Sequence, residues 1–195
     1  MKYVVRIVLV IAVIGLAYSL YESINKPIRF DKEKNRKYDM TIERMKDIRS
    51  SQIAFRDLNQ RYSGDFNELI PFLDTADFIL TQRRDTVIKF YNKVYREYQL
   101  KDSTLVDTLG YRSIKDSLFD KGYNLKQLAF IPETKSKFKI EASTTEKSGL
   151  TVQVFQAIAE KEVILKGMDS DLIKTRSKDL IMGSLTEPNL NGNWQ

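Results

Sequence analysis

The sequence predicts an α+β protein with an N-terminal transmembrane helix, a long amphipathic helix packed on an antiparallel sheet, and a C-terminal helix. Three observations support this prediction. Residues 7–20 hold no charged side chain, apolar side chains recur every three or four residues between Tyr38 and Tyr62, and β-branched and aromatic residues dominate the middle of the chain. Helical patterns near both ends with strand patterns between them are typical of this class.

The apolar N-terminal segment, residues 1–24, is predicted to anchor the chain in a membrane. A spanning helix needs about 20 apolar residues, and the segment reaches this length if the Arg6 side chain extends to the headgroups. The alternative is a secretory signal peptide with an apolar core at residues 7–17 and a small-residue cleavage site at residues 17–19. We favour the uncleaved anchor because no proline interrupts the helix before Pro27.

Basic residues follow the anchor directly. Residues 25–37, which we expect to form a juxtamembrane linker, contain two acidic residues and six cations: Lys26, Arg29, Lys32, Lys34, Arg36 and Lys37. Two roles fit these cations equally: contact with anionic lipid, at about 1 kcal/mol per basic residue near the surface, or simple solvation of the linker. A positive-inside count favours a cytoplasmic domain. However, large domains after a short N-terminal anchor often translocate, and we expect a periplasmic domain.

A second helix is predicted from about residue 31 to residue 62, after Pro27 ends or kinks the first. One apolar stripe runs along it, formed by Tyr38, Ile42, Met45, Ile48, Gln52, Phe55, Leu58 and Tyr62. The stripe predicts packing on the protein's own sheet. Pairing as a coiled coil is the alternative, and Gln52 weakens it. Ser63-Gly64 is expected to end the helix.

Short elements are predicted next. A capping box from Asp65 to Glu68 opens a helix over residues 66–73. The expected strands, which share a β-branched and aromatic composition, are residues 78–81, 86–91, 94–100 and 111–119. A helix is the alternative for part of this region, since Val87, Tyr91, Val94 and Tyr98 also fit helical spacing, and the Val, Tyr and Phe content favours strands. A hairpin turn is expected at residues 82–85, and one helical turn at residues 124–128.

The clearest hairpin pattern spans residues 138–159, with alternation in its first strand, a turn at residues 146–149 and a return strand from Leu150. We expect the following side chains to be buried where helix and sheet meet: Phe55, Leu58, Ile140, Val152 and Val154. A strand at residues 163–165 and a helix from Asp169 or Ser170 to about residue 181 follow. These elements complete a domain at residues 38–182, and a turn-rich tail occupies residues 183–195.

The composition limits the chemistry of the chain. The sequence contains neither histidine nor cysteine, so the commonest general base, the commonest transition-metal ligand and every thiolate site are absent. No catalytic, cofactor or metal site is therefore expected. Asp169-Ser-Asp171 could ligate Ca²⁺, but a helix N-cap explains it better. The net charge of +6 accompanies no nucleic-acid-binding pattern, so nucleic acid is not an expected partner. Trp194 is expected to pack on the domain, with a partner-facing role as the alternative.

Two resemblances concern the organisation of the chain. The order of apolar N-terminus, proline, long amphipathic helix and antiparallel sheet, with residues 48–65 at the helix end, resembles a type IV pilin or pseudopilin. The Gly-Phe-Thr-Leu-x-Glu processing site of that family is absent, so no functional residue is transferred. Residues 183–189 and 192–194 are similar to the C-termini of uncharacterised single-pass envelope proteins of Bacteroidota. That resemblance implies an envelope location and no particular activity.

The sequence therefore predicts a non-enzymatic, single-pass membrane protein of the cell envelope. It would act as a structural or assembly component through contacts with a protein partner. An extracytoplasmic ligand-binding or sensory domain is the alternative, and it requires a concave pocket in the sheet. An enzyme working with carboxylates alone is disfavoured, since it requires a clustered pair of buried acids.

Overall fold

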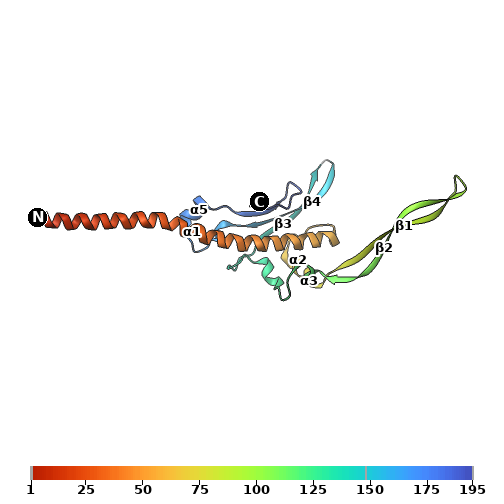
Figure 1. Ribbon diagram of the computed structural model, residues 1–195, viewed down its shortest axis with the longest axis horizontal. Helices are drawn as coiled ribbons and strands as arrows, with labels where there is room; N and C mark the ends of the chain where they lie inside the picture. The colour runs from red at the N-terminus through yellow and green to blue at the C-terminus, as the bar shows by residue number, and fades with distance from the viewer. Residues whose placement is uncertain (1, 148, 195) are drawn as a thin grey trace.

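The computed structural model describes residues 2–147 and 149–194 and confirms the α+β class. An N-terminal helix of 58 residues, α1 (Lys2–Asn59), precedes two small antiparallel sheets and several short helices. The first half of α1 projects from one end of the elongated molecule, a two-stranded arm projects from the other, and the body lies between them (Figure 1). Three residues that fall within the predicted anchor, hairpin turn and tail lie outside the described residues: Met1, Ser148 and Gln195.

Among the described residues, α1 is the one helix long and apolar enough to cross a membrane. None of its most apolar stretch is buried inside the molecule, and residues 7–20 are exposed on every side of the helix. A helix that is apolar all round has no face suited to water. Its N-terminal half is therefore available for contacts outside the chain.

The helix runs through Pro27 without ending, so the two predicted helices are one. Pro27 cannot donate a hydrogen bond to the carbonyl of Ser23, and an interior proline costs a helix about 3 kcal/mol. Tertiary contacts lie on both sides of the proline. Lys26 pairs with Asp169 at 2.6 Å, and Phe30 is buried in the core.

The main sheet has three antiparallel strands in the order β3 (Lys139–Lys147), β4 (Leu150–Ala159) and β5 (Leu180–Ser184). The predicted hairpin is confirmed, and Ile140 of β3 pairs with Ala157 of β4. Strand β5 was not predicted. Its residues pair with the second half of β4 and so lie on the edge of the sheet away from β3.

The face of β4 that joins the core is the opposite of the predicted one. Phe155, Ala157 and Ala159 belong to the core cluster. Alternation along the strand places Val152 and Val154 on the other face, where Val154 is buried outside this cluster and Val152 is half-buried.

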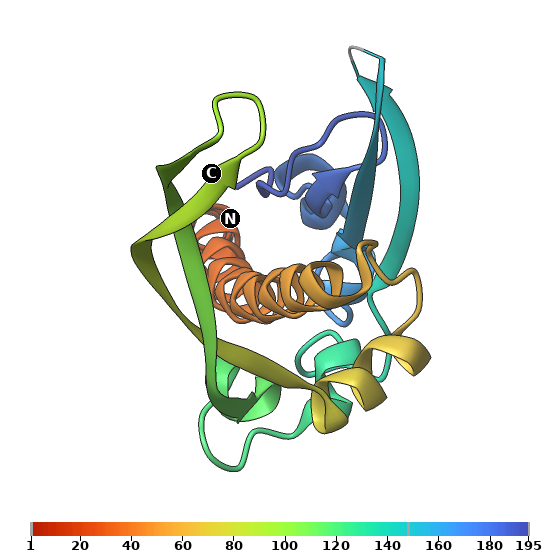
Figure 2. The same ribbon diagram turned by 90° about the vertical axis from the view of Figure 1, so that its right-hand side faces the viewer.

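The second half of α1 lies between the sheet and a layer of short helices (Figure 2). The buried members of the predicted stripe are Met45, Ile48, Gln52, Phe55 and Tyr62. They share one core with the sheet residues, so packing of the stripe on the protein's own sheet is confirmed. Leu58 departs from the prediction: it is 43% exposed and lies one residue before α1 ends at Asn59.

The arm consists of β1 (Asp77–Asn92) and β2 (Glu97–Ser113), paired antiparallel along their whole length (Figure 1). The predicted turn at residues 82–85 is wrong, because these residues continue β1. They include no Gly, Pro or Asn to favour a reversal. The chain instead reverses at residues 93–96, so the four expected strands reduce to two long ones.

Two short helices agree with the sequence. Asp65 caps α2 (Phe66–Thr75), and its carboxylate accepts a hydrogen bond from the Asn67 amide at 3.0 Å. The predicted helical turn is the 3₁₀ helix η1 (Leu125–Ala129), capped by Asn124. Both caps satisfy amides that the first turn leaves without helical partners.

Three other predictions need correction. The strand expected at residues 111–119 ends at Ser113, which caps helix α3 (Ile114–Leu118). The strand expected at residues 163–165 is helix α4 (Lys161–Ile164), which brings Ile164 and Leu165 into the core. The last helix, α5 (Ser170–Arg176), begins at the predicted cap Asp169 but ends early, because the residues that follow join β5.

Candidate functional site

The six cations predicted to contact the membrane all lie on α1, within residues 25–37. Three of them form ion pairs with the body: Lys26 with Asp169 at 2.6 Å, Arg36 with Glu133 at 2.7 Å, and Lys37 with Glu133 at 3.7 Å. Two others pair within the helix: Arg29 with Glu22 at 3.1 Å and Lys34 with Asp31 at 3.1 Å. Lys32 is exposed and forms no ion pair with the described residues.

These pairs hold the carboxylates of the body in their charged form. A hydrogen bond from the Arg36 guanidinium lowers the pKa of Glu133, and one from Lys26 lowers the pKa of Asp169. The pKa of Asp31 is lowered by Lys34 and further by Arg176 of α5. The basic segment therefore fastens α5 and the loop around Glu133 to α1.

The helix also sets the distance of each cation from the apolar half. At a rise of about 1.5 Å per residue, Lys26 lies about 9 Å beyond Leu20 along the axis, and Lys37 lies about 26 Å beyond it. The Debye length is about 8 Å at physiological ionic strength. A bilayer around the apolar half would thus attract Lys26 and Arg29 much more strongly than Lys37. The sequence prediction took the six cations together, whereas along the helix they lie at different distances from the apolar half.

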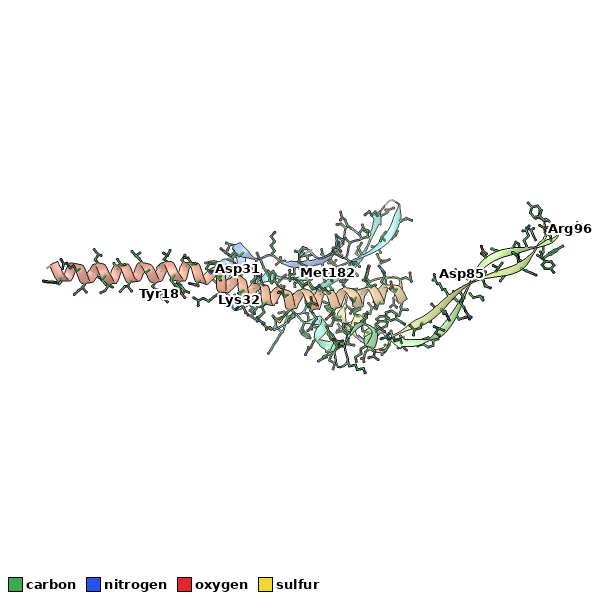
Figure 3. All side chains as sticks on the ribbon, in the orientation of Figure 1. Tyr18, Asp31, Lys32, Asp85, Arg96 and Met182 are labelled. Carbon is green, nitrogen blue, oxygen red and sulfur yellow. The ribbon has the colours of Figure 1, made fainter. Side chains whose placement is uncertain are left out.

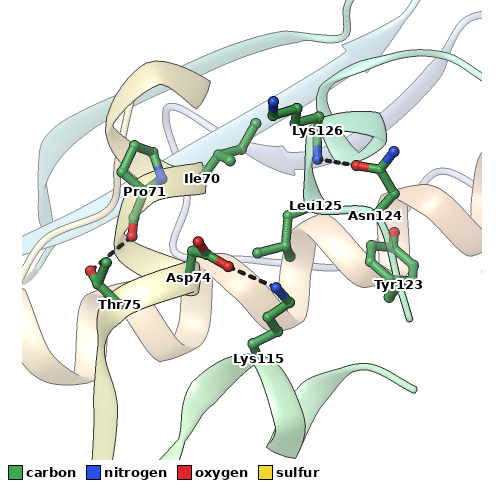
Figure 4. Close-up of a pocket in the computed structure, with 9 residues that line it drawn as sticks. All are labelled: Ile70, Pro71, Asp74, Thr75, Lys115, Tyr123, Asn124, Leu125 and Lys126. Atoms are coloured by element: carbon green, nitrogen blue, oxygen red, sulfur yellow. Dashed lines mark hydrogen bonds and ion pairs between the residues drawn. The ribbon is translucent and has the colours of Figure 1, made fainter. Parts of the chain in front are cut away.

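A groove of about 480 Å³ lies among α2, α3 and the segment that contains η1 (Figure 4). Its lining residues are Ile70, Pro71, Asp74, Thr75, Lys115, Tyr123, Asn124, Leu125 and Lys126. Asp74 and Lys115 point toward each other and form an ion pair, with 2.7 Å between Lys115 Nζ and Asp74 Oδ1. The Thr75 hydroxyl donates a hydrogen bond to the Pro71 carbonyl at 2.9 Å, within its own helix.

Tyr123 lines the groove but directs its hydroxyl to α1. The hydroxyl donates to the Asp47 carboxylate at 2.7 Å, and the ring stacks on Phe119 with centroids 4.3 Å apart. Burial and the Asp47 carboxylate raise the pKa of Tyr123 above its usual range, so the phenol is protonated at neutral pH. The groove therefore offers a protonated phenol and a closed ion pair. Neither group is suited to act as a nucleophile or a general base.

Residues 2–147 and 149–194 contain no group of three or more His, Cys, Asp or Glu side chains that could hold a metal ion. The two aspartates of Asp169-Ser-Asp171 lie at the start of α5. The Asp169 carboxylate caps that helix by accepting hydrogen bonds from the amides of Asp171 and Leu172 at 3.0 and 3.1 Å. This is the predicted N-cap. Trp194 packs against the core cluster, as expected.

The arm is the feature that the sequence interpretation missed. No described side chain of β1 or β2 is fully buried, and apolar side chains are exposed along both strands. One signal could have revealed it: residues 78–91 contain no Gly, Pro or Asn, and Asp85 is the one residue among them that turns favour. A single long strand was therefore the simpler interpretation.

The chain matches no family model, no curated protein and no solved structure. Three features bear on its function: the exposed apolar half of α1, the basic segment that fastens the body to this helix, and the arm at the far end.

Proposed function

We propose that the chain is a membrane-anchored subunit of the cell envelope that works through protein–protein contacts and not by catalysis. The observation that carries this proposal is α1, whose apolar side chains at residues 7–20 are exposed on every side while the same helix continues into the core of the body. Such a helix half is stable in lipid, where its backbone groups are satisfied within the helix. Because helix and body are continuous, an anchor of this kind would hold the body at a defined height and orientation.

A pilin-like assembly role fits this arrangement. One unbroken helix has an exposed apolar half and a second half covered by an antiparallel sheet. This is the organisation expected from the resemblance to pilins. Since the processing site of that family is absent, we propose lateral contacts between anchors within the bilayer rather than polymerisation through a processed N-terminus. We further propose that the body lies on the periplasmic side, as large domains after a short anchor often do.

A ligand-binding or sensory role has less support. It calls for a concave pocket in the sheet, whereas the groove lies on the side of α2 and η1. The hollow of about 390 Å³ that adjoins β4 at Thr151, Val152 and Gln153 is lined otherwise by the polar side chains of Arg56, Asp57 and Gln60. The ion pair of Asp74 with Lys115 spans part of this groove. A ligand would have to compete with that pair.

Membrane fractionation tests the anchor. The full chain should remain in the membrane pellet after sodium carbonate extraction. A variant that begins at Glu22 should be soluble, and it keeps both Phe30 in the core and the pair of Lys26 with Asp169. Recovery of a mature N-terminus near Leu20 by mass spectrometry would show a cleaved signal and refute the anchor.

Photo-crosslinking in native membranes tests the lateral contacts. A photoreactive amino acid in place of Leu9 or Ile14, both exposed on α1, should capture a protein neighbour. The same group in place of the exposed Lys121 of the body serves as the control site. Adducts to lipid alone at both anchor positions would contradict assembly through this half of the helix.

A further inference from the structure

The outer end of the arm, residues 89–101, carries a group of exposed apolar side chains that we call the tip cluster: Tyr91, Val94, Tyr95, Tyr98 and Leu100. Val94 is 84% exposed and Tyr98 is 75% exposed. The rings of Tyr91 and Tyr98 meet edge to face with centroids 5.3 Å apart. The pairing of Tyr91 with Tyr98 and of Lys89 with Leu100 places Tyr91, Tyr98 and Leu100 on one face of the arm. Val94 and Tyr95 lie in the turn at its end.

The turn at the tip satisfies part of its backbone internally. The side-chain oxygen of Asn92 accepts hydrogen bonds from the amides of Val94 and Tyr95 at 3.0 and 3.4 Å. The Asn92 amide group donates in turn to the side-chain oxygen of Gln99 at 3.0 Å. An amide without a partner is costly in an apolar medium. The tip can therefore enter such a medium without exposing these two amides.

Charge also distinguishes the tip from the stem of the arm. Residues 89–101 contain four cations and one anion, whereas the rest of the arm contains three cations and four anions. The four tip cations, Lys89, Lys93, Arg96 and Lys101, form no ion pair within the part of the chain that the structure describes. In the stem, Arg84 pairs with Asp107. Unpaired cations beside aromatic and aliphatic side chains are complementary to a bilayer surface, which has anionic headgroups outside and acyl chains beneath them.

The tip lies far from the apolar half of α1. Figure 3 shows Arg96 at one end of the molecule and Tyr18 near the other. Residues 22–59 of α1 span about 57 Å at 1.5 Å per residue. The 16 residues of β1 add up to about 50 Å. A bilayer that holds α1 is thus roughly 100 Å from the tip.

We propose that the tip cluster inserts into the surface of a second bilayer with anionic headgroups, so that the chain bridges two membranes. The bridging rests on the proposed anchor at the other end, whereas lipid binding by the tip stands on the tip alone. Val94 and Tyr95 enter the boundary between headgroups and acyl chains, and Lys93 and Arg96 remain at the level of the phosphates. A second copy docked tip to tip is disfavoured, because it would bring two sets of unpaired cations together.

A single-site fluorescent reporter tests the insertion. The chain has no cysteine, so Val94→Cys creates one site for an environment-sensitive dye. Val87→Cys, at an exposed valine in the stem, is the matched control. The full chain in phosphatidylcholine nanodiscs is mixed with protein-free vesicles, with or without phosphatidylglycerol. With anionic vesicles, the emission of the dye at residue 94 should shift to the blue and brighten severalfold. It should not change with neutral vesicles, and the dye at residue 87 should respond to neither.

Charge variants test the recognition of anionic lipid. Lys93→Gln combined with Arg96→Gln should weaken the apparent affinity for anionic vesicles about 30-fold. Arg83→Gln combined with Arg84→Gln, in the stem, should leave it unchanged. No response at residue 94, or an equal response to neutral vesicles, would overturn the proposal. A further sample contains vesicles that carry the unlabelled chain. A response to these vesicles and not to protein-free anionic vesicles would identify a second copy as the occupant and overturn the proposal as well.

Failure of the anchor can be told apart from failure of the tip. Co-elution of the chain with the nanodisc reports on α1 alone. If the chain does not enter the disc, the same labelled chain held in amphipol still reports on the tip when anionic vesicles are added. A dye at residue 94 that stays silent there refutes lipid binding by the tip, whatever the state of the anchor.

Discussion

At the scale of single residues, Gln52 determines how the chain turns back after α1. Its side chain donates to the Ser63 carbonyl at 2.8 Å and accepts from the Ser63 amide at 2.9 Å. Both residues are fully buried. A polar side chain in the middle of an apolar stripe thus satisfies two backbone groups that would otherwise lack partners in the core.

Replacement of Gln52 with Leu should therefore destabilise the body. Both backbone groups of Ser63 would remain buried without partners, at a cost of about 1–3 kcal/mol in the free energy of unfolding. Denaturant unfolding of the full chain in detergent measures this cost. Gln82→Leu, at an exposed position of the arm, is the control. Equal stability of the two variants would show that water replaces the Gln52 side chain.

Gly183 in β5 is required by both its backbone and its surroundings. Its φ is 76°, and an added Cβ would overlap the carbonyl oxygen of Phe155. Gly183→Ala should cost about 2–4 kcal/mol in the free energy of unfolding. Gly122→Ala, with φ at 93° and no atom within 4 Å of the added Cβ, should cost about 1 kcal/mol from strain alone. Similar losses in both variants would argue against the steric overlap.

At the scale of elements, α1 is joined to the body by apolar packing along the core and by ion pairs along the basic segment. Arg36 reaches Glu133 and Lys26 reaches Asp169, so two separate parts of the chain attach near the base of the body. These side chains are partly exposed, and each such pair contributes little by itself. Together they hold α5 and the loop that contains Glu133 against α1.

This attachment should weaken in acid. The folded-state pKa values of Asp31, Glu133 and Asp169 are lowered, so their contribution is complete above the unfolded pKa of about 4 and is lost as pH falls through the lower folded values. The melting temperature of the full chain in detergent should therefore fall between about pH 5 and pH 3.

A matched pair of variants isolates the contribution of the Glu133 pairs. Glu133→Gln should show a smaller acid-induced fall in melting temperature. Glu43→Gln is the control, since among the described residues Glu43 pairs only with Lys46, within α1. This variant should show the full acid-induced fall in melting temperature. The attachment would be refuted by a Glu133→Gln variant that keeps the whole acid-induced fall.

At the scale of the whole molecule, we expect the body and the arm to be separate units of stability. An isolated two-stranded ribbon is marginal in water, and the described side chains of the arm are exposed or half-buried. Its two ends meet at the body, where the Ile114 amide donates to the Ala76 carbonyl at 3.1 Å. The arm can therefore be shortened without separating the elements on either side.

Replacement of residues 80–110 by Asn-Gly should leave the melting temperature of the body unchanged. The dipeptide closes a tight hairpin between Ile79 and Tyr111, which pair in the natural arm. Phe78, which packs against the core, is retained. Differential scanning calorimetry of the two chains gives the comparison. A large fall in melting temperature would show that the arm stabilises the body.

Local chemistry allowed much of this molecule to be predicted from the sequence. The apolar segment, the caps at Asp65 and Asp169 and the hairpin at residues 138–159 depend on side chains within a few positions of one another. The absence of His and Cys narrowed the available chemistry without any structure. The α+β class followed from these local patterns.

The way these elements pack and pair depends on residues far apart in the chain. Pro27 lies inside one helix that continues into the core, where Phe30 packs with residues far along the chain. Phe155, and not Val154, joins the core because the choice of face depends on what lies opposite β4. Arg36 meets Glu133, 97 positions away, so a segment expected to be a linker also holds the body together. Local patterns carry no information about such distant partners, and these partners decide which surfaces remain free to act.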